Sequence, residues 1–154
     1  MNIQVVPIAK TEMLIRKPIS EVFEAFVNPE ITSKFWFTSG SGRLKAGEQV
    51  QWDWEMYNHS VEVSVKAIEE NHRILIEWGE PASATTVEWI FGARPGGSTL
   101  VSVTNSGFKG DGDEIVKQAL DSTGGFSLVL AGAKAFLEHN IMLNLIGDRY
   151  PEGH

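Results

Sequence analysis

One stretch near the C-terminal end decides the fold: residues 126–139 read FSLVLAGAKAFLEH. Its apolar side chains recur every three or four positions and predict an amphipathic helix; they are Val129, Leu130, Ala133, Phe136 and Leu137. Small residues such as Gly132 would let this helix approach a neighbouring surface closely. A separate short helix is expected at residues 113–121, ahead of Gly124 and Gly125. Because no other helix of comparable length is predicted, the long helix must pack against a sheet.

Upstream of this helix the apolar pattern changes to alternation. From Val50 to Tyr57, apolar and polar residues alternate, which predicts a half-buried strand. Similar alternation predicts further strands near residues 61–67, 74–78, 85–91 and 100–105. Because short turns join these strands, the sheet is expected to be an antiparallel meander.

The N-terminal part of the chain is predicted to form a strand, two short helices and a loop. The strand covers about residues 3–16, and Pro18 opens the first helix. Asn28 caps the second helix, which runs toward Trp36. Residues 38–42 are rich in glycine and serine and predict a loop.

The composition fits one α+β domain over residues 1–154 and excludes several classes of function. Thirteen Lys and Arg against 20 Asp and Glu give a net charge of −7, which disfavours binding to nucleic acid or to an anionic membrane surface. Cysteine is absent, which excludes disulfides, thiolate nucleophiles and Cys-ligated zinc. With neither a leader-like segment nor a spanning helix recognised, we expect a cytoplasmic protein. The unusual feature is aromatic: the chain has five Trp and eight Phe.

The order of elements and several motifs resemble the AHSA1-like family, named after homologues of the activator of Hsp90 ATPase, in the START-like or polyketide cyclase (SRPBCC) superfamily. The motifs are RKPISEVFEAF at 16–26, NPE at 28–30, FWF at 35–37, WDWEMY at 52–57, RILIEW at 73–78, TNSGF at 104–108, GF at 125–126 and KAFLEH at 134–139. The resemblance implies a helix-grip fold, in which a curved antiparallel sheet surrounds one long C-terminal helix and two short helices follow the first strand. The eukaryotic Hsp90 activator has an additional N-terminal domain that this chain has no room for, so the resemblance does not imply co-chaperone activity.

The same resemblance implies a cavity between the concave face of the sheet and the long helix. Aromatic side chains suit a flat apolar ligand, although they could equally fill the core. The expected lining residues are Trp36, Trp52, Trp54, Trp78, Trp89, Phe91, Asn105, Phe126, Leu130 and Phe136. Within this set, Asn105 would offer a polar group to a ligand carbonyl or hydroxyl, or be satisfied by backbone or water. The leading hypothesis is therefore binding of an apolar small molecule, such as a lipid, isoprenoid or polyketide, without catalysis and without a cofactor.

Two other functions stay open at this point. An enzyme of the cyclase or hydrolase kind would need Glu55 or Glu88 to meet Tyr57 or Asn105 in the cavity. The strand face that carries these carboxylates would then have to be the concave face, in place of the face that carries the tryptophans. A protein-interaction or chaperone-related role, like that of the Hsp90 activator, would use the aromatic residues 35–37 as an exposed patch, or these rings could form a lid over the cavity. The chain is expected to be a monomer or a homodimer.

The remaining chemistry-bearing residues do not form recognisable motifs. The four histidines are His59, His72, His139 and His154, and none has the spacing of a paired metal ligand, so no metal site is expected. No serine has the Gly-x-Ser-x-Gly context of an activated nucleophile, and no glycine-rich phosphate loop is present. No catalytic residue is therefore assigned.

Overall fold

The computed structural model describes residues 5–153 and contains a seven-stranded antiparallel sheet with the strand order β1-β7-β6-β5-β4-β3-β2. The strands are β1 (Ala9–Ile15), β2 (Ser39–Gly40), β3 (Gln49–Trp54), β4 (His59–Glu69), β5 (Arg73–Trp78), β6 (Thr85–Arg94) and β7 (Ser98–Ser106). The helices are α1 (Ile19–Val27), α2 (Pro29–Thr32), α3 (Gly112–His139) and α4 (Leu145–Arg149), with a 3-10 turn, η1 (Glu55–Tyr57), after β3. His154 and the predicted start of the first strand near residue 3 lie outside the described residues.

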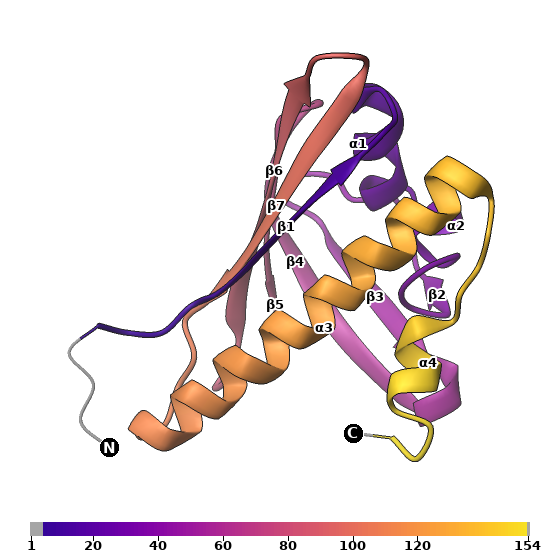
Figure 1. Cartoon of the computed structure of the whole chain (residues 1–154). Helices are drawn as coiled ribbons and strands as arrows, with labels where there is room; N and C mark the ends of the chain where they lie inside the picture. Colours follow the sequence, from indigo (N-terminus) through magenta and orange to yellow (C-terminus); the bar gives the residue numbers. More distant parts are fainter. Residues whose placement is uncertain (1–4, 154) are drawn as a thin grey trace.

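The helices cover one face of the sheet. Figure 1 shows α3 crossing the sheet diagonally, with α1, α2 and α4 on the same side. The strand residues that face the helices are buried; they include Val50, Trp52, Val63, Ile74, Ile76, Val87, Trp89, Phe91, Val101 and Val103. From α3, the buried stripe comprises Phe126, Val129, Leu130 and Ala133. The predicted packing of the long helix on the sheet is thus confirmed, and the architecture is the helix-grip α+β fold.

The long helix is longer than the sequence analysis predicted. α3 has 28 residues, so the separate helix at 113–121 and the break at Gly124 and Gly125 are wrong. Neither glycine adopts a left-handed φ angle, and the helix passes through both. Each glycine costs about 1 kcal/mol relative to alanine in a helix, a penalty that packing of the flanking turns outweighs. Asp111 caps the start of α3 by accepting a hydrogen bond from the Glu114 N–H at 2.9 Å.

Two strand boundaries also differ from the prediction. β1 begins at Ala9, which pairs with Asn105 at the end of β7, and Gly107 (φ 88°) then turns the chain away. β3 ends at Trp54 instead of continuing to residue 57, because the chain enters η1 and then the left-handed Asn58 (φ 49°). The alternation therefore stops before Tyr57, whose side chain is turned out of the strand pattern.

The predicted loop at residues 38–42 contains the short strand β2. Ser39 pairs with Asp53 and Gly40 pairs with Trp52, so this segment forms the far edge of the sheet. A Cβ atom at Gly40 would lie 2.8 Å from the Pro29 Cβ and 3.2 Å from the Trp52 ring, so only glycine allows the edge to approach α2 this closely.

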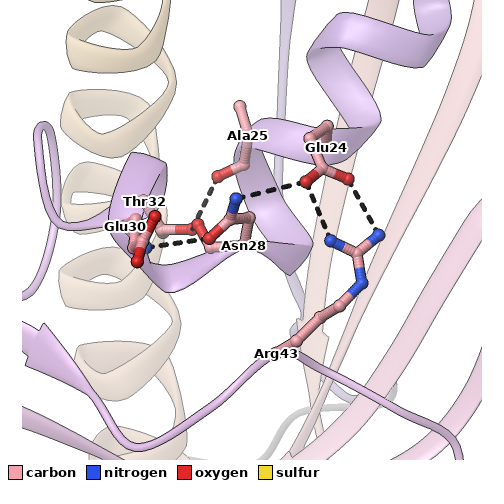
Figure 2. A network of polar contacts seen from close by, with 6 residues as sticks. All are labelled: Glu24, Ala25, Asn28, Glu30, Thr32 and Arg43. Carbon is pink, nitrogen blue, oxygen red and sulfur yellow. Dashed lines mark hydrogen bonds and ion pairs between the residues drawn. The ribbon is translucent and has the colours of Figure 1, made fainter.

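The junction of α1 and α2 is held by polar contacts (Figure 2). The Asn28 side chain caps α2 by accepting from the Glu30 N–H, as predicted, and its amide donates to Glu24. Glu24 in turn receives two hydrogen bonds from Arg43, both 2.8 Å, which lower the pKa of this carboxyl below its usual value. The buried Thr32 hydroxyl donates to the carbonyl of α1 at Ala25, 2.6 Å away. These contacts fix the segment that carries Trp36 toward the centre of the fold.

A second set of contacts ties the end of α3 to β1. The Glu138 carboxylate accepts from the Arg16 N–H (2.7 Å) and from the Lys134 ammonium (2.6 Å), and the ammonium also donates to the Leu14 carbonyl (2.8 Å). Burial alone would raise the pKa of Glu138, but the bonds from Arg16 and Lys134 outweigh it, so the pKa lies below its usual value. The carboxylate form therefore stabilises the grip of the helix on the sheet.

Replacing Glu138 by glutamine is expected to lower the free energy of unfolding by about 1 kcal/mol at neutral pH, since the charge-assisted bond with Lys134 is lost. Because the folded pKa is lowered, the charge contributes its stability above the unfolded pKa, about 4.3, and loses it as the pH falls through the folded value. Urea titrations of wild type and E138Q should therefore converge in acid. The exposed Glu62 provides the control, E62Q; a difference between wild type and E138Q that persists unchanged in acid would contradict the assignment.

None of the helices described for residues 5–153 combines the length and the hydropathy that crossing a bilayer would require.

Candidate functional site

A cavity of about 440 Å³ lies between the sheet and the helices α3 and α4. Each element from β3 to β7 contributes wall residues, and α3 closes the opposite side. The apolar wall consists of Trp36, Trp54, Val61, Trp78, Phe126, Val129, Ile146 and the ring of Tyr150. A hollow of this size and lining is typical of sites for small organic molecules.

The aromatic wall is organised around Trp36. Its ring centroid lies 4.9 Å from that of Trp52 and between 5.8 and 6.2 Å from those of the other three tryptophans. It also meets Phe126 of α3 at 5.6 Å in an edge-on arrangement. All five tryptophans of the chain therefore belong to one cluster, part of which faces the cavity.

One end of the cavity is polar. The Asn105 amide donates to the Thr86 carbonyl (2.8 Å) and to the Thr85 hydroxyl (3.0 Å), and its oxygen accepts from the Ser122 hydroxyl of α3 (2.7 Å). The Trp78 indole N–H donates to the same Thr85 oxygen at 3.0 Å. The amide of Asn105 is thus satisfied by protein groups, and Thr85 and Ser122 stand with it in the cavity wall.

The C-terminal helix α4 closes part of the cavity and was not predicted. Its Ile146 is buried in the core, and Ile146 and Tyr150 line the cavity. The Tyr57 hydroxyl lies 2.8 Å from the Tyr150 carbonyl and 3.1 Å from the Ile146 carbonyl, so it can donate to either and holds α4 in place. Burial, with a smaller contribution from Tyr150, raises the pKa of Tyr57. A strand that alternates from Val50 to Tyr57, as predicted, would place Tyr57 on the face opposite the tryptophans. This expectation is wrong, because η1 turns the Tyr57 side chain toward α4.

Half of the ten residues expected to line a cavity do line this one: Trp36, Trp54, Trp78, Asn105 and Phe126. The others pack in the core, where Trp52, Trp89, Phe91 and Leu130 are buried and Phe136 is partly buried. Trp52 stacks on Phe37 at 4.9 Å, and the Trp89 indole N–H has no hydrogen-bond partner among residues 5–153. The wall residues that were not predicted come from several elements; they include Val61 of β4, Thr85 of β6, and Ser122 and Val129 of α3. Ile146 and Tyr150 at the C-terminal end were missed as well, although the apolar pair at residues 145–146 and the following Tyr150 were available signals.

The carboxylates considered for acid–base chemistry lie away from the cavity. Glu88 points to the other face of the sheet, where it accepts from Arg73 at 2.7 Å, and Glu55 is exposed on η1. Neither carboxylate lines the cavity in which Tyr57 and Asn105 lie. Asp53 is held by Ser60, with further bonds from Gln51 and Ser39, and these contacts lower its pKa.

The other candidate features are placed as follows. Residues 35–37 are buried, each less than a tenth exposed, so they do not form a surface patch. His59 lies at the rim of the cavity with its ring 6.0 Å from that of Trp54. Within the described part of the chain, no three His, Asp or Glu side chains gather closely enough to hold a metal ion.

Comparison with solved structures identifies proteins of the same architecture. The protein SSP2350 from Staphylococcus saprophyticus is 30% identical, with a TM-score of 0.76; the match covers 88% of this chain and 95% of that one. DynU16, a protein of the dynemicin biosynthetic locus, is 17% identical with a TM-score of 0.73, covering 88% of this chain and 49% of its own. The Aha1 dimer from Colwellia psychrerythraea is 15% identical with a TM-score of 0.72, covering 86% of this chain and 96% of its own. At these low identities, the last two share the fold.

No curated protein sequence matches the chain significantly. A family profile does match: that of the Activator of Hsp90 ATPase homolog 1-like proteins aligns with residues 16–136. This range includes every strand from β2 to β7 and α3 nearly to its end, and it begins directly after β1. The chain therefore belongs to the family of Activator of Hsp90 ATPase homolog 1-like proteins.

Proposed function

We propose that this protein binds an apolar small molecule in the cavity between the sheet and α3. The observation that carries the proposal is the cavity itself, about 440 Å³ in volume, whose apolar wall is formed largely by aromatic rings. A ligand that loses about 300 Å² of apolar surface there would gain about 7 kcal/mol before entropic costs, so that its affinity would be micromolar at best. The wall accommodates flat rings or short chains, as in a lipid, isoprenoid or polyketide.

The wall supports binding without chemistry on the ligand. The nearest ionisable groups, His59 and Asp121, are exposed residues at the rim, and the hydroxyl of Tyr57 is held by α4. The likeness to DynU16 supports a small-molecule role only at the level of the fold. The dimeric state of the Colwellia protein makes a homodimer the state to test for this chain, and a native mass spectrum of the purified protein would give both its oligomeric state and any retained ligand.

The cavity can be tested with biphenyl as the probe and a matched pair of helix glycines. Gly125 lines the cavity and a Cβ there meets nothing within 4 Å, so Gly125→Leu should fill the cavity without a clash. Gly124 is equally unobstructed but exposed and outside the wall, so Gly124→Leu is the control. Titration followed by NMR should show saturable shifts at wall residues in wild type and in Gly124→Leu.

In Gly125→Leu, the affinity for biphenyl should fall by about tenfold or more, because the leucine occupies the ligand volume. Circular dichroism would check that both variants keep the fold. Equal affinity in the two variants, or shifts confined to the outer surface, would show that apolar molecules do not bind in this cavity.

A further inference from the structure

The polar groups at one end of the cavity restrict the kind of ligand that would bind there. We infer that the site selects uncharged molecules that carry a hydroxyl group, and that this hydroxyl is bound between Thr85 and Ser122. The inference rests on the proposed function, since it concerns the same cavity, and it goes further by assigning the chemical class of the ligand.

The Thr85 hydroxyl supplies a hydrogen-bond donor at this end of the cavity. Its oxygen accepts from the Trp78 indole N–H and from the Asn105 amide, both at 3.0 Å. A hydroxyl oxygen has two lone pairs, so these contacts use both and leave the O–H hydrogen available. Among residues 5–153 no acceptor takes this hydrogen. Thr85 lines the cavity and therefore offers a ligand one hydrogen-bond donor.

The neighbours of the Asn105 amide fix its orientation. The Thr86 carbonyl can only accept, so the group 2.8 Å from it must be the amide nitrogen. The amide oxygen then faces the Ser122 hydroxyl at 2.7 Å, and Ser122 must donate. The lone pairs of Ser122 stay available, and this residue also lines the cavity. Ser122 therefore offers a ligand an acceptor.

A single hydroxyl group satisfies both residues. It can accept from the Thr85 O–H and donate to the Ser122 oxygen, which stand on either side of the same amide. A ketone or ether satisfies only Thr85, and a hydrocarbon satisfies neither. Because an unpaired polar group in an apolar site is costly, the cavity should favour a ligand with such a hydroxyl at this end.

The charge of the residues around the cavity disfavours anionic ligands. Of the described residues that line the cavity, none is Lys or Arg, and the acidic Asp121 lies at its rim. The protein as a whole has a net charge of −7. A carboxylate or phosphate bound here would lose its hydration without gaining a cationic partner, and it would face the lone pairs of Ser122. Fatty acids and phosphorylated molecules are therefore disfavoured relative to alcohols and phenols.

The test compares three probes of one shape: biphenyl, 4-phenylphenol and biphenyl-4-carboxylate. At about pH 8 the phenol is protonated and the acid is ionised. In wild type, we expect the affinity of the phenol to be higher than that of biphenyl, equal to it, or at most about threefold lower. The reason is that Thr85 and Ser122 replace the hydrogen bonds that the phenol makes to water. The carboxylate should bind at least about 30-fold more weakly than the phenol.

The variant Ser122→Ala removes the acceptor. The affinity of the phenol relative to that of biphenyl should fall by about threefold or more. The loss is limited because the Asn105 oxygen behind Ser122 can then accept a hydrogen bond from the phenol. Thr123→Ala is the control, since this neighbouring hydroxyl donates to the Ala119 carbonyl at 2.7 Å and lies outside the cavity wall. In Thr123→Ala, the ratio of the affinities for the phenol and for biphenyl should be unchanged. The comparison of the three probes in wild type does not depend on the folding of any variant.

The outcomes separate the two proposals. If none of the probes binds, the proposed function fails. If biphenyl binds but the phenol is more than about threefold weaker, or if the carboxylate is less than about 30-fold weaker than the phenol, the cavity function stands and the selection of a hydroxyl is overturned.

Discussion

Replacing Trp36 by alanine is expected to lower the free energy of unfolding by about 3–5 kcal/mol, the range for a large aromatic side chain removed from a packed core. Trp36 is 8% exposed and its ring lies within 6.2 Å of the other four tryptophans, measured between centroids. Its removal deletes the shared partner of these rings and opens the floor of the cavity. The loss should therefore exceed that of any single ring at the edge of the cluster.

Chemical denaturation followed by far-ultraviolet circular dichroism would measure this effect. Trp36→Phe keeps a ring at the same place and should cost less, about 1–2 kcal/mol. Met56→Ala is the control, because this side chain is large and apolar but 50% exposed. A loss below about 1 kcal/mol in Trp36→Ala would show that the cluster is not a stabilising core.

The second large effect is expected at Gly132, where α3 lies against the segment that follows α2. A Cβ atom at Gly132 would lie 3.2 Å from both the Cβ and the carbonyl oxygen of Phe35. Because one of these atoms belongs to the backbone, a larger side chain must push α3 away from the segment that carries Phe35. Gly132→Leu is therefore expected to lower the free energy of unfolding by about 2–3 kcal/mol, even though leucine favours the helix by nearly 1 kcal/mol.

The matched substitution Gly124→Leu isolates the effect of contact from that of helix propensity. Gly124 lies in the same helix, and a Cβ atom there meets nothing within 4 Å. This variant should be as stable as wild type or slightly more stable. If thermal or chemical denaturation gave equal shifts for the two variants, close packing at Gly132 would not be the cause.

Much of the fold follows from local patterns in the sequence. Alternation along β7 placed Asn105 on the same face as Val101 and Val103, and all three are buried. The dipeptide Asn28-Pro29 marked the start of α2, and the structure shows the predicted cap. These features were predictable because each depends on residues within a few positions of one another.

The parts that were not predictable depend on tertiary contacts. Gly124 and Gly125 are poor helix formers, and only the packing of α3 against the sheet makes the helix continuous there. Tyr57 leaves the strand pattern because its hydroxyl meets carbonyl groups of α4, about 90 residues later in the chain. β2 exists only because β3 lies beside it. The cavity wall similarly depends on how these distant segments meet. The sequence therefore indicated that aromatic residues would be important, but not which of them line the cavity and which are packed in the core.

The pairing of β1 with β7 has a consequence for how the chain folds. Residues 9–15 bond to residues 99–105, and Lys134 of α3 contacts Leu14 from 120 positions away. Folds dominated by such distant contacts form slowly, in milliseconds to seconds. At a synthesis rate of about 5–20 residues per second, the first strand waits on the order of several seconds for its partner. The sheet and its aromatic face therefore close late, and the chain folds as a whole once α3 has emerged rather than segment by segment during synthesis.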